Sequence, residues 1–233
     1  MFEKFPEFIT DDPRYLDPDD SSSNINRRGQ YVTLEMMEAR HKTMLPKEVC
    51  EGNSILDLGS CISASGAWAL ESGALFYTGV EISDDNYESA YFNMREYFPA
   101  GVWNLHRKSI SEWFGGQKDI YTPFDVVLAA GILYSQEDQI SFLTKCAEIS
   151  KKYLIFETIG THPIDDDQYP ISIYRQVNRM GDGKLINIRC SNEPFISMVL
   201  NPLGFSLEDS RPTWHGNTVR FVARYAKDYA KDS

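Results

Sequence analysis

The chain has 233 residues, enough for one α/β domain with a sizeable core, and hydrophobic residues make up 42% of it, an ordinary globular composition. The net charge of −11 argues against a large nucleic-acid footprint, because phosphate contacts require clustered Lys and Arg. No apolar run approaches the roughly 20 residues of a membrane span, the N-terminus carries no secretory pattern, and the four cysteines form no C-x-x-C pair. We therefore expect a cytoplasmic protein without a metal site or a membrane partner.

The N-terminal part differs in composition from the rest. Residues 1–30 are rich in Asp, Pro, Ser and Asn, which predicts an irregular arm. A helix is expected from about residue 33 to 44, ending before Pro46. Residues 1–48 are thus assigned to an arm and a helix, and 49–233 to one domain.

Strands and helices alternate from residue 54 onward. Apolar runs and turn residues predict strands at 54–58, 75–82, 102–106, 124–130 and 153–157, and helices at 64–72 and 84–97. Further helices are expected from the caps Ser135 and Asp138 to about 150, and from Ser191 and Pro194 to about 200. Strands at 205–213 and 218–226 complete a terminal hairpin. This order predicts an α/β fold with a single doubly wound sheet, mostly parallel, an antiparallel C-terminal hairpin, and helices on both faces.

Two features lie where such a sheet binds ligands, at the carboxyl ends of its strands. Asp57-Leu58-Gly59 ends the first strand, and a glycine there allows a tight turn and close approach of a ligand. Glu81 ends the second strand, 24 residues after Asp57. Its carboxylate can accept two hydrogen bonds from a ribose diol.

Over roughly residues 50–227 the chain resembles class I, Rossmann-like S-adenosylmethionine-dependent methyltransferases. The matching segments are Ile55-Leu56-Asp57-Leu58-Gly59, Val80-Glu81-Ile82, Lys108-Ser109-Ile110, Phe124–Gly131, and Leu203-Gly204-Phe205 with the final hairpin. The family usually has two further glycines after the first, at the positions that Cys61 and Ser63 occupy here.

The resemblance implies that S-adenosylmethionine is the cofactor and S-adenosylhomocysteine the product. The residues that would contact the cofactor are Asp57, Gly59, Ser60, Cys61, Glu81, Ile82, Ser109, Ile110, Ala129 and Ala130. Arg28 and Tyr31, just before the first helix, are candidates for its carboxylate.

Methyl transfer needs a general base only when the acceptor must lose a proton. Glu157, His162 and Tyr134 are the candidates, because they lie at or after the carboxyl ends of the fourth and fifth strands. The long polar segment 158–190 is expected to be a lid or a substrate-recognition insertion.

The sequence favours a methyltransferase acting on a small molecule or an RNA. A catalytically inactive cofactor-binding or scaffold protein is the alternative, favoured by Cys61 and Ser63 in place of glycines. A nicotinamide-dependent dehydrogenase is a third hypothesis, against which the absence of G-x-G-x-x-G counts.

Overall fold

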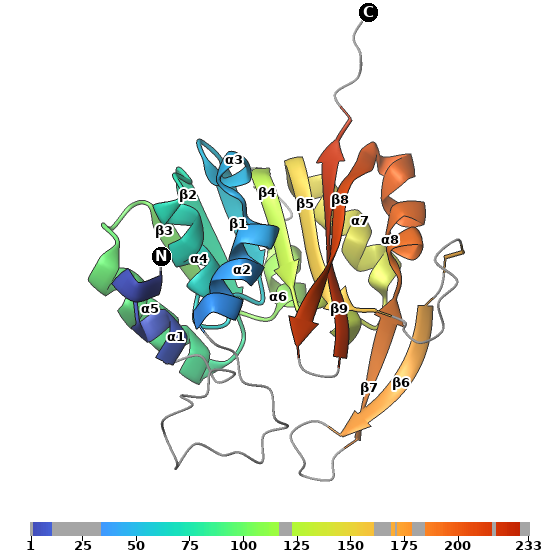
Figure 1. The fold of residues 1–233 in the computed structure, drawn as a ribbon, viewed down its shortest axis with the longest axis horizontal. Coiled ribbons are helices and arrows are strands. Elements are labelled where there is room, and N and C mark those ends of the chain that lie inside the picture. Colours follow the sequence, from blue (N-terminus) through green and yellow to red (C-terminus); the bar gives the residue numbers. More distant parts are fainter. Residues whose placement is uncertain are drawn as a thin grey trace, which may run out of the picture. The chain divides into compact units, whose positions relative to one another are not determined.

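The computed structural model describes residues 2–10, 34–116, 123–160, 169–170, 172–178, 185–215 and 218–228 (Figure 1). The chain divides into two compact units, Met1–Tyr121 and Thr122–Ser233. Within the described ranges, no helix is long and apolar enough to cross a membrane. Arg28, Tyr31 and His162 lie outside these ranges.

The first unit contains three parallel strands in the order β3-β2-β1. Its elements are η1 (Phe2–Lys4), α1 (Glu7–Thr10), α2 (Leu34–Met44), α3 (Lys47–Cys50), β1 (Ser54–Leu58), α4 (Ala64–Glu71), β2 (Phe76–Glu81), α5 (Asp84–Tyr97), β3 (Trp103–Arg107) and α6 (Ile110–Gly116). The strands and helices predicted for this region are confirmed, while η1, α1, α3 and α6 were not predicted. Helix α4 contacts β1 and β2, and α5 contacts β2 and β3. Strands β1 and β2 are buried along almost their whole length, as parallel strands covered by helices are. Strand β3 is mostly half-buried or exposed.

The first residues of the chain differ from the predicted irregular arm. Residues 2–10 carry two short helical segments, and Phe2 and Phe8 are fully buried. The Phe2 ring lies edge-on to His41 at 5.0 Å between ring centres, and the Phe5 ring lies edge-on to Tyr97 at 5.1 Å. Buried aromatic rings contribute large apolar areas, so this segment belongs to the core of the first unit.

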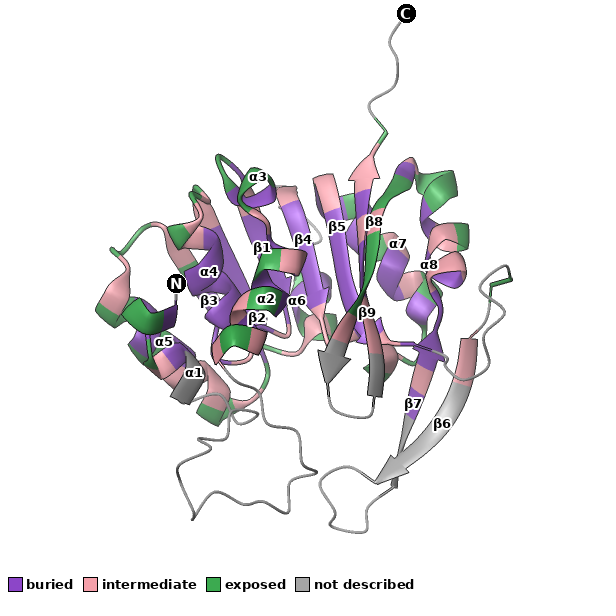
Figure 2. Ribbon diagram, in the orientation of Figure 1, coloured by how far each residue is buried: buried purple, intermediate pink, exposed green. Residues whose placement is uncertain are grey.

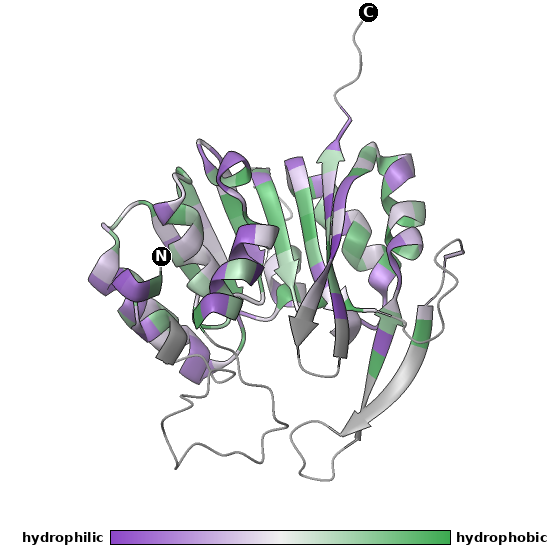
Figure 3. Cartoon of the chain, viewed as in Figure 1, coloured by the Kyte–Doolittle hydropathy of each residue, from purple (hydrophilic) through white to green (hydrophobic). Residues whose placement is uncertain are grey.

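The second unit has strands in the order β4-β5-β9-β8. Its elements are β4 (Phe124–Ala130), η2 (Leu133–Ser135), α7 (Gln139–Ile149), β5 (Ser150–Ile159), β6 (Ser172–Asn178), β7 (Leu185–Ser191), α8 (Glu193–Leu200), η3 (Asn201–Leu203), β8 (Phe205–His215) and β9 (Thr218–Lys227). Strands β4 and β5 are parallel, and β9 runs antiparallel to both β5 and β8, which confirms the terminal hairpin. Figure 2 shows β4 and β5 buried along most of their length, and Figure 3 shows that they are largely hydrophobic.

Strands β6 and β7 form a separate two-stranded antiparallel sheet inside the predicted insertion 158–190. Its base is fixed by the fully buried side chain of Gln139 at the start of α7. Gln139 Nε2 donates to the Arg189 carbonyl at 2.9 Å, and Ser191 Oγ donates to Gln139 Oε1 at 2.6 Å. We call this sheet the β6–β7 ribbon.

Two helix caps differ from the prediction. Asp138, rather than Ser135, caps α7 by accepting from the Ser141 amide at 2.9 Å. Asn192, rather than Ser191, caps α8 by accepting from the Phe195 amide at 3.1 Å. In both cases the residue directly before the first helical turn can reach the free amide.

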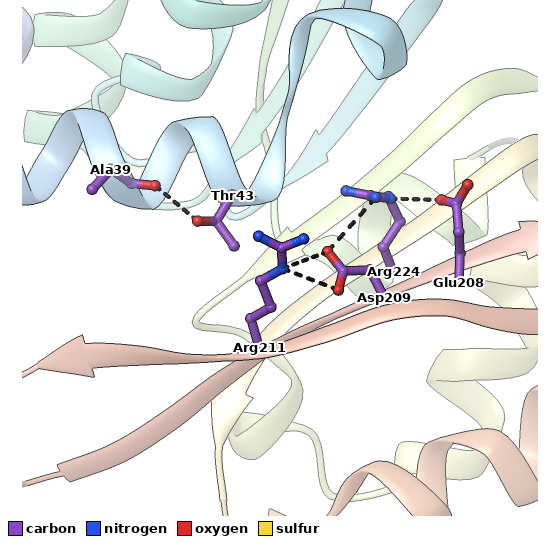
Figure 4. A network of polar contacts seen from close by, with 6 residues as sticks. All are labelled: Ala39, Thr43, Glu208, Asp209, Arg211 and Arg224. Atoms are coloured by element: carbon purple, nitrogen blue, oxygen red, sulfur yellow. Dashed lines mark hydrogen bonds and ion pairs between the residues drawn. The ribbon is translucent and has the colours of Figure 1, made fainter.

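Ion pairs join the two strands of the terminal hairpin where its register shifts, between Leu207 and Asp209. Figure 4 shows Arg224 bound to Glu208 at 2.7 Å and to Asp209 at 3.7 Å, with Arg211 on the same Asp209 carboxylate at 2.9 Å. These contacts are partly exposed, so they stabilise the hairpin only modestly. The figure also shows Thr43 Oγ1 donating to the Ala39 carbonyl inside α2, at 2.9 Å.

Candidate functional site

The turn after β1 is fixed to the end of β2 by backbone hydrogen bonds. The amides of Gly59 and Ser60 both donate to the Val80 carbonyl, at 2.8 and 3.0 Å. Gly59 has a φ of 79°, in the left-handed region that favours glycine. Among the described residues, Cys61 and Ser63 are the non-glycine residues with positive φ, at 51° and 62°. The two residues that replace the expected glycines therefore keep the backbone that glycine would adopt.

Glu81 is held in place by this turn. One carboxylate oxygen accepts from the Cys61 amide at 2.8 Å and the other from the Ser83 amide at 2.7 Å. The residue is 8% exposed, and its backbone carbonyl accepts from the Lys108 amide at 3.0 Å. A carboxylate oxygen has two lone pairs, so each oxygen bound by one amide can still accept from a ligand hydroxyl.

Three other predicted residues follow the ends of β2 and β3. Ile82 directly follows Glu81 and is 68% exposed, an apolar side chain available to a flat ring. Ser109 forms a capping box with Glu112: its hydroxyl accepts from the Glu112 amide at 3.2 Å, and its own amide donates to the Glu112 carboxylate at 2.8 Å. Ile110 is the first residue of α6 and partly exposed. Ser109 thus has a structural role that is independent of any ligand.

Asp57 is 2% exposed and accepts a hydrogen bond from the Tyr77 hydroxyl at 2.9 Å. Tyr77 is fully buried in β2, and its ring lies against Gly66 of α4. A Cβ on Gly66 would come within 2.5 Å of that ring. Gly66 therefore serves close packing of α4 on β2, and it does not supply the left-handed conformation that the turn needs.

Two hydroxyls in the same turn are buried beside the Tyr77 hydroxyl. Ser60 and Ser63 are 5% and 0% exposed. Hydrogen bonding from both serines acts to lower the pKa of Tyr77, although burial and the charge of Asp57 raise that pKa overall. The two serines therefore belong to a buried polar cluster with Tyr77 and Asp57, while the Glu81 carboxylate at the strand end can accept from a cofactor that carries donors.

In the second unit, the predicted residues lie at the ends of β4 and β5. Ala129 is fully buried, and Ala130, the last residue of β4, is partly exposed. Gly131 follows with a φ of 73°, and its amide donates to the Glu157 carbonyl at 2.8 Å. This bond joins the ends of the two parallel strands.

Glu157 is completely buried and forms an ion pair. Its carboxylate accepts from Arg220 Nη1 of β9 at 3.2 Å and from Thr213 Oγ1 of β8 at 3.5 Å. The same guanidinium lies over the ring of Tyr134, 5.4 Å from its centre, and its Nε is buried without a partner. The structure thus brings Tyr134 and Glu157 together around Arg220, which the sequence did not indicate.

Comparison with known proteins places this geometry in context. No family model and no curated protein matches the sequence. A magnesium protoporphyrin IX methyltransferase from Synechocystis, solved with bound S-adenosylmethionine, is similar in structure, with 13% identity, a TM-score of 0.61, and coverage of 83% of this chain and 79% of that one. A Burkholderia thailandensis 1,6-didemethyltoxoflavin N1-methyltransferase was solved with 1,6-didemethyltoxoflavin and S-adenosylhomocysteine. It is 16% identical, with a TM-score of 0.63 and coverage of 83% of this chain and 78% of that one. A candidate RNA methyltransferase from Pyrococcus horikoshii is 14% identical, with a TM-score of 0.56 and coverage of 98% of this chain and 100% of that one.

The fold is that of the Rossmann-like methyltransferases. The predicted class, an α/β doubly wound sheet that is mostly parallel with an antiparallel hairpin, is confirmed by these structures. Sequence reasoning missed Tyr77 and Arg220. The sequence around Tyr77 and Arg220 carries no pattern that indicates their contacts, because the partner of each residue is distant in sequence and is brought close only by strand pairing.

Proposed function

We propose that the chain is an S-adenosylmethionine-dependent methyltransferase acting on a small-molecule or RNA acceptor. The observation that carries the proposal is Glu81, a carboxylate fixed by two backbone amides at the carboxyl end of β2. A ribose diol requires such an acceptor pair, and Ile82 beside it offers an apolar surface to adenine. Solved structures of the same fold contain S-adenosylmethionine or S-adenosylhomocysteine, which supports this cofactor.

The cofactor would supply a methyl group on a sulfonium, which the acceptor atom displaces in line. On the acceptor side, Glu157 is a poor general base, because taking a proton would break its ion pair with Arg220. Tyr134 is the better candidate to contact an acceptor, since it is partly exposed and its ring is held by Arg220. Ala129 and Ala130, at the end of β4, remain proposed cofactor contacts. His162, Arg28 and Tyr31 remain proposed members of the site.

The acceptor remains open between two classes. Solved neighbours include an enzyme named for a small heterocycle and a candidate RNA methyltransferase. The net charge of −11 favours the small molecule, and we propose that the β6–β7 ribbon within 158–190 recognises it.

Calorimetric titration with S-adenosylhomocysteine tests the cofactor. We expect Glu81→Ala to weaken binding by about 1.5–3 kcal/mol, the scale of a charge-assisted hydrogen bond. Glu48→Ala, which removes an exposed carboxylate of α3, is the matched control and should bind like the wild type. If the wild-type protein does not bind S-adenosylhomocysteine at millimolar concentration, the proposal is wrong. If Glu81→Ala binds it with the same affinity as the wild type, Glu81 does not belong to the site.

The alternative, a cofactor-binding scaffold without catalysis, is tested separately. Labelled methyl groups should pass to a metabolite extract or to total small RNA when the protein is incubated with labelled S-adenosylmethionine. Cofactor binding without transfer to either pool would favour the scaffold, and binding of a nicotinamide dinucleotide instead would favour the dehydrogenase.

A further inference from the structure

Helix α5 carries a row of side chains that the described part of the chain leaves exposed. Tyr91 and Phe92 are 39% and 59% exposed, and Glu88 and Arg95 are exposed as well. These four residues follow the spacing i, i+3, i+4 and i+7, which places them on one face of a helix. We call this face the α5 stripe.

The elements packed around α5 leave the stripe open. The N-terminal segment contacts the end of the helix, where the Phe5 ring lies edge-on to Tyr97. Towards the sheet, the Tyr91 ring lies edge-on to Trp103 of β3, with 5.8 Å between ring centres. Among the described strands, β3 pairs only with β2, so its outer edge has no partner. Exposed aromatic rings beside an unpaired strand edge are typical of a surface that binds another chain.

The α5 stripe is complementary to a second copy of itself. Glu88 lies three residues before Tyr91, and Arg95 lies three residues after Phe92, so opposite charges stand symmetrically about an apolar centre. When two α5 helices lie antiparallel with these centres in contact, Glu88 of each copy faces Arg95 of the other. A two-fold axis brings the same patch of both copies together in this way. The charge pattern therefore fits a second copy of this chain.

The other acidic residues of α5 do not oppose this pairing. They are Asp84, Asp85 and Glu96. The same register places Glu96 opposite Tyr87 of the other copy, and the two aspartates opposite residues 98 and 99, which carry no charge. No carboxylate faces another across the axis, so the net charge of −11 does not prevent the two helices from meeting.

We propose that the α5 stripe is the interface of a homodimer, in which the α5 helices of two copies pack antiparallel across a two-fold axis. Tyr91 and Phe92 of both copies form its apolar centre, and two ion pairs between Glu88 and Arg95 border that centre. One helix face is small for an interface, so we expect a dissociation constant of about 1–10 µM. The inference concerns assembly and does not depend on the proposed function.

Charge reversal tests this arrangement on the full chain. Glu88→Arg places an arginine opposite Arg95 of the other copy, and Arg95→Glu places a glutamate opposite Glu88. Each of these variants should dimerise at least about tenfold more weakly than the wild type, because two attractive pairs become repulsive. The double variant exchanges the two charges and should dimerise like the wild type.

Mixing the two single variants tests the antiparallel register. Glu88→Arg carries arginine at both positions, and Arg95→Glu carries glutamate at both. A heterodimer of the two therefore has two attractive pairs, and it should form although neither variant dimerises well alone. If the mixture associates no better than the separate variants, the antiparallel pairing is wrong.

Sedimentation velocity from about 1 to about 100 µM protein measures the association. Phe92→Ser, which removes the more exposed ring of the centre, should leave the chain monomeric. Glu48→Arg makes the same charge reversal at an exposed position of α3 and should dimerise like the wild type. Circular dichroism checks that each variant is folded. A monomeric wild type over this range, or a dimer that Phe92→Ser and both charge reversals leave unchanged, would overturn the inference.

Discussion

Arg220 Nη1 donates to the Glu157 carboxylate at 3.2 Å, and this pair joins β9 to β5 in the interior of the second unit. The Glu157 side chain is 0% exposed and that of Arg220 16% exposed. Removing one partner would leave the other charge buried and uncompensated. The pair is therefore a stronger constraint on the hairpin than the partly exposed pairs of Arg224.

Glu157→Gln and Arg220→Met should each lower the free energy of unfolding by about 3–5 kcal/mol, while the double variant should lose less than the sum. Urea unfolding of all three proteins measures this coupling. Glu208→Gln, which breaks the pair with Arg224, is the control and should cost about 1 kcal/mol or less. Strictly additive losses would mean that the Arg220–Glu157 pair contributes nothing as a pair.

Gly66→Ala should destabilise the first unit. The new Cβ would lie 2.5 Å from the Tyr77 ring, so α4 must move away from β2, at a cost of about 1–3 kcal/mol. Gly115→Ala in α6 is the control, because no atom lies within 4 Å of its Cβ position. Thermal unfolding of the two variants should differ clearly, and equal melting temperatures would contradict the packing described for α4.

Cys61→Gly should stabilise the protein. Cys61 has a left-handed backbone, which costs a non-glycine residue about 1–2 kcal/mol of stability. Glycine avoids this cost, but it loses more conformational entropy on folding, which offsets about half of the benefit. The net gain in unfolding free energy should be up to about 1 kcal/mol. Cys61→Ala removes the thiol but keeps the strain, so it should show no gain. A stabilised alanine variant would show that the thiol, and not the backbone, is unfavourable.

Ser109→Ala should lower the free energy of unfolding by about 1 kcal/mol, because it removes the cap of α6. Ser111→Ala, at an exposed position in the first turn, should change stability less. Titration of the same two proteins with S-adenosylhomocysteine tests the proposed cofactor contact of Ser109. That contact requires weaker binding by Ser109→Ala alone.

The stability that Tyr77 contributes should depend on alkaline pH. Its pKa is raised in the folded protein, so below the ordinary value of 10.0 it is protonated in both states. Above that value the unfolded chain ionises first and the folded state loses stability. The difference in unfolding free energy between wild type and Tyr77→Phe should therefore shrink from pH 8 toward about pH 11. Tyr169→Phe, at an exposed tyrosine, is the control; a difference that stays constant with pH would contradict the raised pKa.

Local patterns predicted most of the elements because each has its own determinants. The helix Asp84–Tyr97 was predicted to the residue, since Ser83 caps it and Pro99 follows it. The capping box of Ser109 and Glu112 could have indicated α6. Alternating apolar residues on either side of Gly181-Asp182-Gly183 could have indicated the β6–β7 ribbon.

The polar contacts of the site could be predicted only in part. Asp57, Gly59 and Glu81 stand at strand ends, where position in the sequence already implies position at the sheet edge. Tyr77 and Arg220 lie in the middle or at the start of strands, and their partners are 20 and 63 residues away. Their contacts depend on register between strands, which no local pattern specifies.

The backbone of Cys61 donates to Glu81, while its side chain is partly exposed; Cys50, Cys146 and Cys190 are buried. Burial also raises the pKa of the Cys50 thiol to about 12 and that of Cys146 further, which keeps both protonated and unreactive at neutral pH. A thiol-directed fluorophore should therefore label the folded chain first at Cys61. The chain thus carries a natural attachment point for an optical reporter beside Glu81, with no engineered cysteine required.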